Sequence, residues 1–244
     1  MRRITSVLLI GALIGIGGCA ATQQAKSVEK SGFMDQKTYS MLKEGKKVSP
    51  MFEDVEDQVA LVYVNPDFLA GKYKFTKIKL DPVTVFVGKD SPLSKVEPKD
   101  REMMADLLWN RLHDELGKDY AMVNQLGPET IWYQLAITEG EESNVVLDSI
   151  SSVIPQARML SGMKSLATGV SAFTGVAAAE FKFTDGETGT LLAAAVDRRG
   201  GTKSLYGVTN SWNDVDQAYR FWAEKSRYRL CQVRKGTNCV PPKP

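Results

Sequence analysis

The stretch VAAAEFKFTDGETGTLLAAAV, residues 176–196, decides the fold class of this chain. Its two apolar arms, VAAAEFKF and TLLAAAV, are separated by DGETG, and the glycines and aspartate of that segment are typical of a tight turn. The pattern predicts a β-hairpin. A hairpin makes at least part of the sheet antiparallel.

Amphipathic helices are expected before and after this hairpin. Residues 99–116 carry an apolar residue at every fourth position, and Gly117 follows as a suitable end of the helix. A last helix is expected to begin at Ser211, and another helix is expected over residues 156–171. The expected buried stripes are Met104, Leu108, Leu112 and Leu116 in the first helix and Val215, Ala218, Tyr219 and Trp222 in the last.

Other segments have the composition of strands. TIWYQLAIT, residues 130–138, alternates cleanly, and shorter strands are expected over residues 59–64 and 120–123. Residues 74–88 form a further strand whose phase changes at Pro82, which predicts a bulge or an edge position there. Because strands and helices are interspersed, we predict a two-layer α+β fold, with a mixed, mainly antiparallel sheet and helices packed on one face.

The first residues of the chain indicate its destination. Arg2 and Arg3 precede an apolar run that is shorter than the roughly 20 residues of a membrane-spanning helix but suits a secretory signal. The run ends in IGGC, the pattern that precedes the lipid-modified cysteine of bacterial lipoproteins. We therefore predict a signal peptide over residues 1–18, acyl chains such as palmitate on Cys19, and a lipidated tether over residues 19–32. An ordinary signal peptide with an accidental cysteine is the alternative.

The remaining chain has the size of one domain, which we expect over residues 33–235, with a tail over residues 236–244. Without the two arginines of the signal, basic and acidic residues are equal in number. This balance argues against a nucleic-acid partner, which would require a basic excess. Ala20 stands where an aspartate would retain a lipoprotein in the inner membrane. We therefore expect a lipid anchor in the bacterial outer membrane, with the domain facing either the periplasm or the cell surface.

Two cysteines remain after Cys19. Cys231 and Cys239 are separated by a short spacer that contains Gly236, and the envelope outside the inner membrane is oxidising. We therefore predict a disulfide between them. A metal site is not expected, because zinc needs about four ligands and no histidine lies near.

No pattern in the sequence indicates a reaction, and neither a cofactor nor an enzymatic activity is expected. The chain has a single histidine, His113, which we interpret as a residue on the flank of the first helix. Ser161 and Lys164 form the S-x-x-K spacing of penicillin-binding proteins, but the S-D-N and K-T-G motifs that accompany it are missing. The charged run from Asp197 to Lys203 is interpreted as a loop between hairpin and helix, with anion binding as the alternative.

Six long stretches, in order along the chain, resemble one family, the bacterial lipoproteins catalogued as domain of unknown function 3313. The resemblance covers residues 31–231 and implies an envelope lipoprotein, without a reaction or catalytic residues. The stretches are SGFMDQKTYSMLKEG (31–45), YKFTKIKLDPVTVF (73–86), ELGKDYAMV (115–123), SSVIPQARMLSGMKSLATG (151–169), LLAAAVDRRGGTKSL (191–205) and SWNDVDQAYRFWAEKSRYRL (211–230).

These observations favour a non-catalytic binding or assembly factor of the cell envelope. Its expected partners are the membrane, through the lipid, and either another envelope protein or a second copy of the chain. Residues 145–179, with few charges and many small residues, are interpreted as core or as such an interface. The alternative function is a hydrolase of an envelope polymer that uses Ser161 and Lys164.

Overall fold

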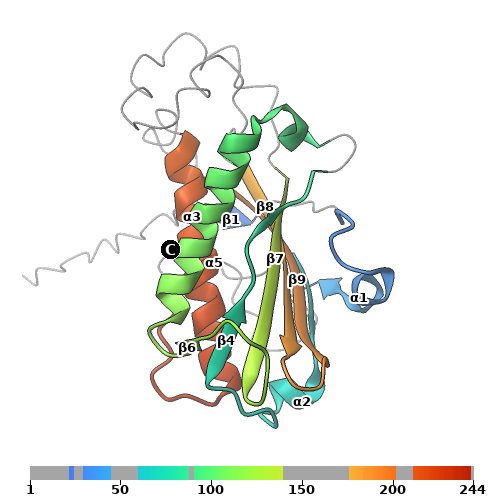
Figure 1. The fold of residues 1–244 in the computed structure, drawn as a ribbon, viewed down its shortest axis with the longest axis vertical. Helices are drawn as coiled ribbons and strands as arrows, with labels where there is room; N and C mark the ends of the chain where they lie inside the picture. Colours follow the sequence, from blue (N-terminus) through green and yellow to red (C-terminus); the bar gives the residue numbers. More distant parts are fainter. Residues whose placement is uncertain are drawn as a thin grey trace, which may run out of the picture.

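A computed structural model describes residues 22–24, 30–44, 60–87, 91–139, 176–201 and 211–242. Within these residues, nine strands form one mixed sheet, and two long helices cover one of its faces (Figure 1). The main strand order is β2-β3-β9-β8-β7-β4-β6, with β1 beside β9 and β5 beside β7. The predicted α+β class is confirmed.

The centre of the sheet is antiparallel. It consists of β7 (Thr130–Glu139), β8 (Val176–Asp185) and β9 (Leu191–Gly201). The predicted hairpin of β8 and β9 is present, and its turn is closed by Asp185, whose Oδ1 accepts from the Thr188 amide at 2.7 Å. Gly189 has a φ of +72°, a conformation that favours glycine.

The strand β9 continues past the expected end of the hairpin at Val196. Residues 197–200 still pair with β8, and residues 199–201 pair with β1 (Thr22–Gln24). The interpretation of residues 197–201 as a loop was therefore wrong. Charged residues usually mark a loop, but here Asp197 and Arg199 are buried together under a helix and form an ion pair.

Shorter strands extend the sheet on both sides. Beyond β9 lie β3 (Leu61–Val64) and then β2 (Lys43–Glu44), both antiparallel to their neighbours. On the other side, β4 (Lys77–Leu80) runs parallel to both β7 and β6 (Ala121–Met122).

The change of phase predicted at Pro82 is the break between two strands. The chain leaves β4 at Leu80 and pairs again with β7 as β5 (Thr84–Val85), also in parallel. The amide of Asp81 still donates to the Tyr133 carbonyl at 3.0 Å, so the break is confined to the residues around the proline. Proline has no amide to donate at that point.

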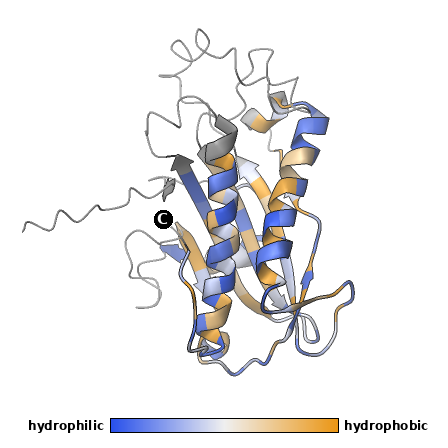
Figure 2. Cartoon of the chain, turned by 90° about the vertical axis from the view of Figure 1, so that its left-hand side faces the viewer, coloured by the Kyte–Doolittle hydropathy of each residue, from blue (hydrophilic) through white to orange (hydrophobic). Residues whose placement is uncertain are grey.

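The helical layer consists of α3 (Pro98–Leu116) and α5 (Ser211–Val233), which lie side by side (Figure 2). Every residue of the two predicted stripes is buried, and Met104, Leu108, Leu112 and Leu116 are completely inaccessible. Shorter helices are α2 (Pro66–Leu69) and a 3-10 turn, η4 (Pro92–Lys95). The expected helix over residues 156–171 lies outside the described residues.

Two arginine–carboxylate contacts connect the long helices. Arg111 of α3 donates to Asp216 of α5 through Nε at 2.8 Å and Nη2 at 3.2 Å. Farther along, Arg227 of α5 binds both oxygens of Asp119 and also Glu115. The hydrogen bond to Asp119 raises the pKa of Arg227. Both contacts are partly exposed, so we assign them mainly to the alignment of the helices.

Part of the opposite face of the sheet is covered by residues 30–44, which we call the strap. It contains the short helix α1 (Gln36–Met41), and its Met34 and Tyr39 pack on Ala194 and Val196 of β9. Thus the long helices lie on one face, as predicted, and the strap covers part of the other. Two described parts of the fold, β1 and the first residues of the strap, therefore belong to the expected tether.

A buried carboxyl holds the strap. Glu180 of β8 is inaccessible to solvent; its Oε2 accepts from the Tyr39 hydroxyl at 2.7 Å and its Oε1 from the Ser31 amide at 2.8 Å. The Tyr39 oxygen in turn accepts from the amide of Gly32 at 2.7 Å. Burial, together with the bond to Glu180, raises the pKa of Tyr39.

We predict that Tyr39→Phe lowers the free energy of unfolding by about 1–3 kcal/mol, because it leaves a buried carboxyl oxygen without its donor. Above pH ~10 the unfolded chain loses the Tyr39 proton before the folded chain does, so the wild type loses stability with rising pH. This loss should be smaller in the variant. Urea unfolding at pH 7 and at several alkaline pH values measures both effects. Tyr63→Phe, on the same face, is the control, and equal stability of the two variants would contradict the role of Tyr39.

Candidate functional site

An apolar pocket lies between the C-terminal half of α5 and the sheet. Its volume is about 90 Å³. The walls come from β3, β7, β8, β9, α2 and α5, and they are almost entirely aliphatic or aromatic. An apolar concavity with a few polar groups at one side is the usual form of a binding site.

Small residues on β9 create the space. Ala193 and Ala195 face α5, and in the register of the sheet they lie beside Val64 and Val62 of β3. An alanine side chain ends at Cβ and therefore cannot fill the distance that separates a helix from a sheet. A larger residue at either position would occupy the pocket.

Aromatic rings close the inner wall. Tyr133 of β7 stacks on Phe183 of β8 with ring centroids 4.1 Å apart, and its hydroxyl lies 3.0 Å from Ser226 Oγ on α5. Burial raises the pKa of Tyr133, so the group is a neutral phenol at physiological pH. Phe181 meets Trp222 edge-on at 5.5 Å. These contacts give the pocket a rigid wall.

The charged groups of the pocket come from one side, the helix α5. Lys225 and Arg229 line it together with Ser226. Lys225 is only 5% exposed, with its Nζ 5.7 Å from the centre of the Phe221 ring. From Lys225 to the end of the chain the sequence contains no acidic residue. The charged side chains of the pocket lining, Lys225 and Arg229, are therefore both basic.

A buried ion pair fixes α5 above β9. Asp197 Oδ2 accepts from Arg199 Nε at 3.0 Å and from Trp222 Nε1 at 2.8 Å, and both charged side chains are inaccessible. The guanidinium carbon of Arg199 is 3.4 Å from the centre of the Phe221 ring. Because Trp222 also lines the pocket, this cluster sets the position of the helix over the alanines.

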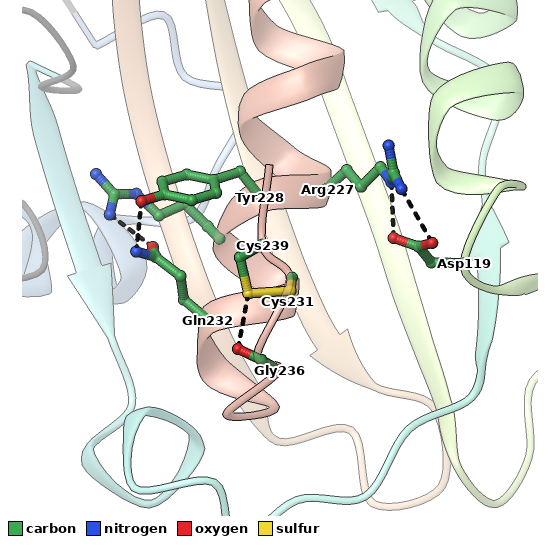
Figure 3. The surroundings of a disulfide bond; sticks show 8 residues. Asp119, Arg227, Tyr228, Cys231, Gln232, Gly236 and Cys239 are labelled. Carbon is green, nitrogen blue, oxygen red and sulfur yellow. Dashed lines mark hydrogen bonds and ion pairs between the residues drawn. A yellow bond between two sulfur atoms is a disulfide. The ribbon is translucent and has the colours of Figure 1, made fainter. Parts of the chain in front are cut away.

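A disulfide secures the C-terminal end of α5. Cys231, on the helix, is bonded to Cys239, and their Cα atoms are 5.5 Å apart (Figure 3). A Cβ on Gly236 would lie 2.7 Å from Cys231 Sγ, so the turn between the cysteines requires glycine. The neighbours of Cys231 on the helix, Leu230 and Val233, line the pocket. The disulfide thus holds the last turn of α5, beside the pocket.

A second hollow lies at the edge of the sheet near β4 and α3. It is larger, about 390 Å³, and half of its lining is polar, with Lys79, Asp81, Asp106 and Trp109 among its residues. Asp81 accepts from Trp132 Nε1 at 2.6 Å and pairs with Lys79. Because its central carboxyl is already satisfied within the fold, this hollow is the weaker candidate.

The other residues that the sequence analysis considered are only partly within the described residues. His113 stacks on Trp109 at 4.7 Å with its side chain 40% exposed, in agreement with its interpretation as a helix-flank residue. Over the described ranges, no group of three or more potential ligands could hold a metal ion, and no helix is long and apolar enough to cross a membrane. Cys19, Ser161, Lys164 and most of residues 145–179 lie outside the described residues.

Comparisons with known proteins give a family and a weak structural likeness. The sequence model of a family described as "Protein of unknown function (DUF3313)" matches residues 29–226. No curated protein matches. Among solved structures, two crystal forms of a PelC dodecamer from Paraburkholderia phytofirmans, one a point variant, each match at 10% identity and a TM-score of 0.36. Each match covers 72% of this chain and 96% of the PelC chain, and a likeness at this TM-score carries no argument.

We predict that Cys239→Ser lowers the free energy of unfolding by about 2–3 kcal/mol, because the open loop adds conformational entropy to the unfolded chain. Urea unfolding under non-reducing conditions measures the loss, and Asn238→Ser serves as the neighbouring control. Mass spectrometry of unreduced peptides from envelope-purified protein should recover residues 231 and 239 in one cross-linked species. Two free thiols in that protein would contradict the pairing.

Proposed function

The chain belongs to the DUF3313 family of proteins of unknown function, and we propose that it is a non-catalytic binding protein of the bacterial cell envelope. In this proposal, lipid on Cys19 anchors the protein to the outer membrane, and the pocket under α5 receives an apolar side chain of a partner protein. The observation that carries the proposal is the apolar pocket beside Ala193 and Ala195.

The proposed location is supported by the N-terminal signal sequence. An Arg-Arg start, a short apolar run and the IGGC box occur together and in the order that a lipoprotein signal requires. Two or three acyl chains on one cysteine give stable anchoring. The cysteine pair near the C-terminus suits the oxidising compartment that such a signal leads to.

The size of the pocket favours a side chain as its occupant. An engineered apolar cavity of about 150 Å³ takes up benzene, so about 90 Å³ suits one aliphatic side chain such as leucine or methionine. Binding energy between proteins concentrates in a few anchors of this kind, seated in pockets and surrounded by a polar rim. The acyl chain of a lipid occupies a larger volume than this pocket provides.

The charge beside the pocket favours an acidic partner. The charged side chains that line the pocket, Lys225 and Arg229, are both basic, although the mature chain is balanced as a whole. Complementary charge steers association and selects among partners. We therefore infer a partner segment with one large apolar residue flanked by aspartate or glutamate.

The anchor is tested by metabolic labelling with palmitate. The wild type should incorporate the label, and Cys19→Ala should lose it completely, because the modified sulfur is absent. Cys239→Ser is the matched control, since it also replaces a cysteine by substitution but leaves Cys19, and it should be labelled normally. Equal labelling of wild type and Cys19→Ala would exclude the anchor.

The pocket is tested by filling it. A photoreactive residue replaces Leu69, which lines the pocket, and is activated in living cells. We expect one discrete cross-linked protein. Its yield should fall at least tenfold when Ala195→Leu is added, because the leucine side chain then occupies the space that the partner's side chain would fill. Ala121→Leu, at an exposed position of β6, is the control and should leave the cross-link intact.

Thermal unfolding of the purified variants separates blocked binding from misfolding. If Ala195→Leu unfolds the domain, Val64→Phe fills the same pocket from β3. A cross-link that persists in the filled variants, or an adduct that mass spectrometry identifies as lipid, would exclude a protein anchor in this pocket.

A further inference from the structure

The position of β1 determines which end of the domain lies nearest the lipid. Thr22 pairs with Gly201 and Gln24 with Arg199, so β1 lies against the last residues of β9. Cys19 is three residues before Thr22 in the sequence. The ordered domain therefore begins almost immediately after the cysteine that carries the proposed lipid.

The length of the chain between Cys19 and Thr22 limits how far the proposed lipid can lie from β1. Three residues span at most about 11 Å when fully extended, whatever conformation they adopt. The strand β9 has 11 residues and is therefore about 36 Å long at a rise of roughly 3.3 Å per residue. The connection is thus about a third of the length of the strand whose end it reaches.

The two ends of the sheet carry different features (Figure 1). The end of β9 lies at the same end of the molecule as the first residues of α3 and α5. The other end holds α2, the turn between β8 and β9, the last turn of α5 and the disulfide. The pocket belongs to this second end, because Phe68 and Leu69 of α2 and Val233 of α5 line it.

We propose that the end of the sheet formed by β1 and the last residues of β9 faces the lipid bilayer, and that the pocket end faces away from it. The proposal rests on the lipid at Cys19. Because the connection is short, the lipid surface is the neighbour of the β1 end, and the pocket receives its partner from the aqueous side.

The experiment uses the full lipidated chain, purified and reconstituted into vesicles of phosphatidylethanolamine and phosphatidylglycerol that carry a short-range quencher on a lipid headgroup. A fluorophore is attached to one introduced cysteine under non-reducing conditions. Lys99→Cys, at the start of α3, reports the β1 end, and Thr188→Cys, in the β8–β9 turn, reports the other end; both positions are exposed. We expect at least twofold stronger quenching at position 99.

A linker variant provides the matched control. Insertion of 20 glycine and serine residues between Ala20 and Ala21 lengthens the connection beyond the height of the domain. The difference between the two positions should then shrink toward zero. A difference that is unchanged by the linker would mean that something other than the short connection orients the domain, and it would overturn the proposal.

The remaining outcomes separate the orientation from the anchor. Equal quenching at the two positions, or stronger quenching at position 188, in protein that floats with the vesicles would overturn the orientation and leave the anchor intact. If the wild type does not float, or if Cys19→Ala floats equally well, the lipid anchor itself is wrong and the orientation falls with it.

Discussion

The buried carboxyl of Asp197 is the constraint on which the helical face of the structure depends. A carboxyl without access to water must receive hydrogen bonds within the protein, because an unpaired buried charge costs several kcal/mol. Its donors are Arg199, two residues along the same strand, and Trp222 on α5. The helix therefore cannot shift along β9 without breaking a buried bond. This fixed position, together with the short side chains of β9, keeps the pocket open.

The other face of the same hairpin follows the same rule. Glu180 points away from the helices, and its donors, Tyr39 and Ser31, both belong to the strap. The hairpin of β8 and β9 thus carries one buried carboxyl on each face, and each carboxyl binds a different layer. Apolar packing alone tolerates small displacements, whereas hydrogen bonds to a buried carboxyl have defined geometry. The two acids therefore set how the three layers align.

The sequence predicted the elements whose evidence is local. Met104, Leu108, Leu112 and Leu116 repeat at helical spacing, and the DGETG turn identifies its hairpin, so both were predicted correctly. The extension of β9 was missed because Asp197 and Arg199 look like loop residues until Trp222 is known to lie beside them. The parallel pairing of β4 with β7 was also beyond prediction, since Lys77 and Thr130 are 53 positions apart.

The sequence pattern predicts the alanines of β9 only as part of a hairpin arm. The pocket beside them depends on the distance between α5 and the sheet. This distance is set by a contact between a carboxyl and a tryptophan on different elements, and such a contact leaves no recognisable pattern in the sequence.

The distance of the pocket from the proposed lipid anchor bears on what the basic residues of its lining do. Surface charges interact over a Debye length of about 8 Å at physiological ionic strength. In the proposed orientation, the pocket end lies farther from the bilayer than this by most of the length of β9, about 36 Å. Attraction between its lysines and arginines and anionic headgroups is then largely screened. Lys225 and Arg229 would act on a soluble or neighbouring partner, and the lipid would hold the opposite end. Under this arrangement, charge selects the partner and the acyl chains determine the location, so each function is assigned to its own end of β9.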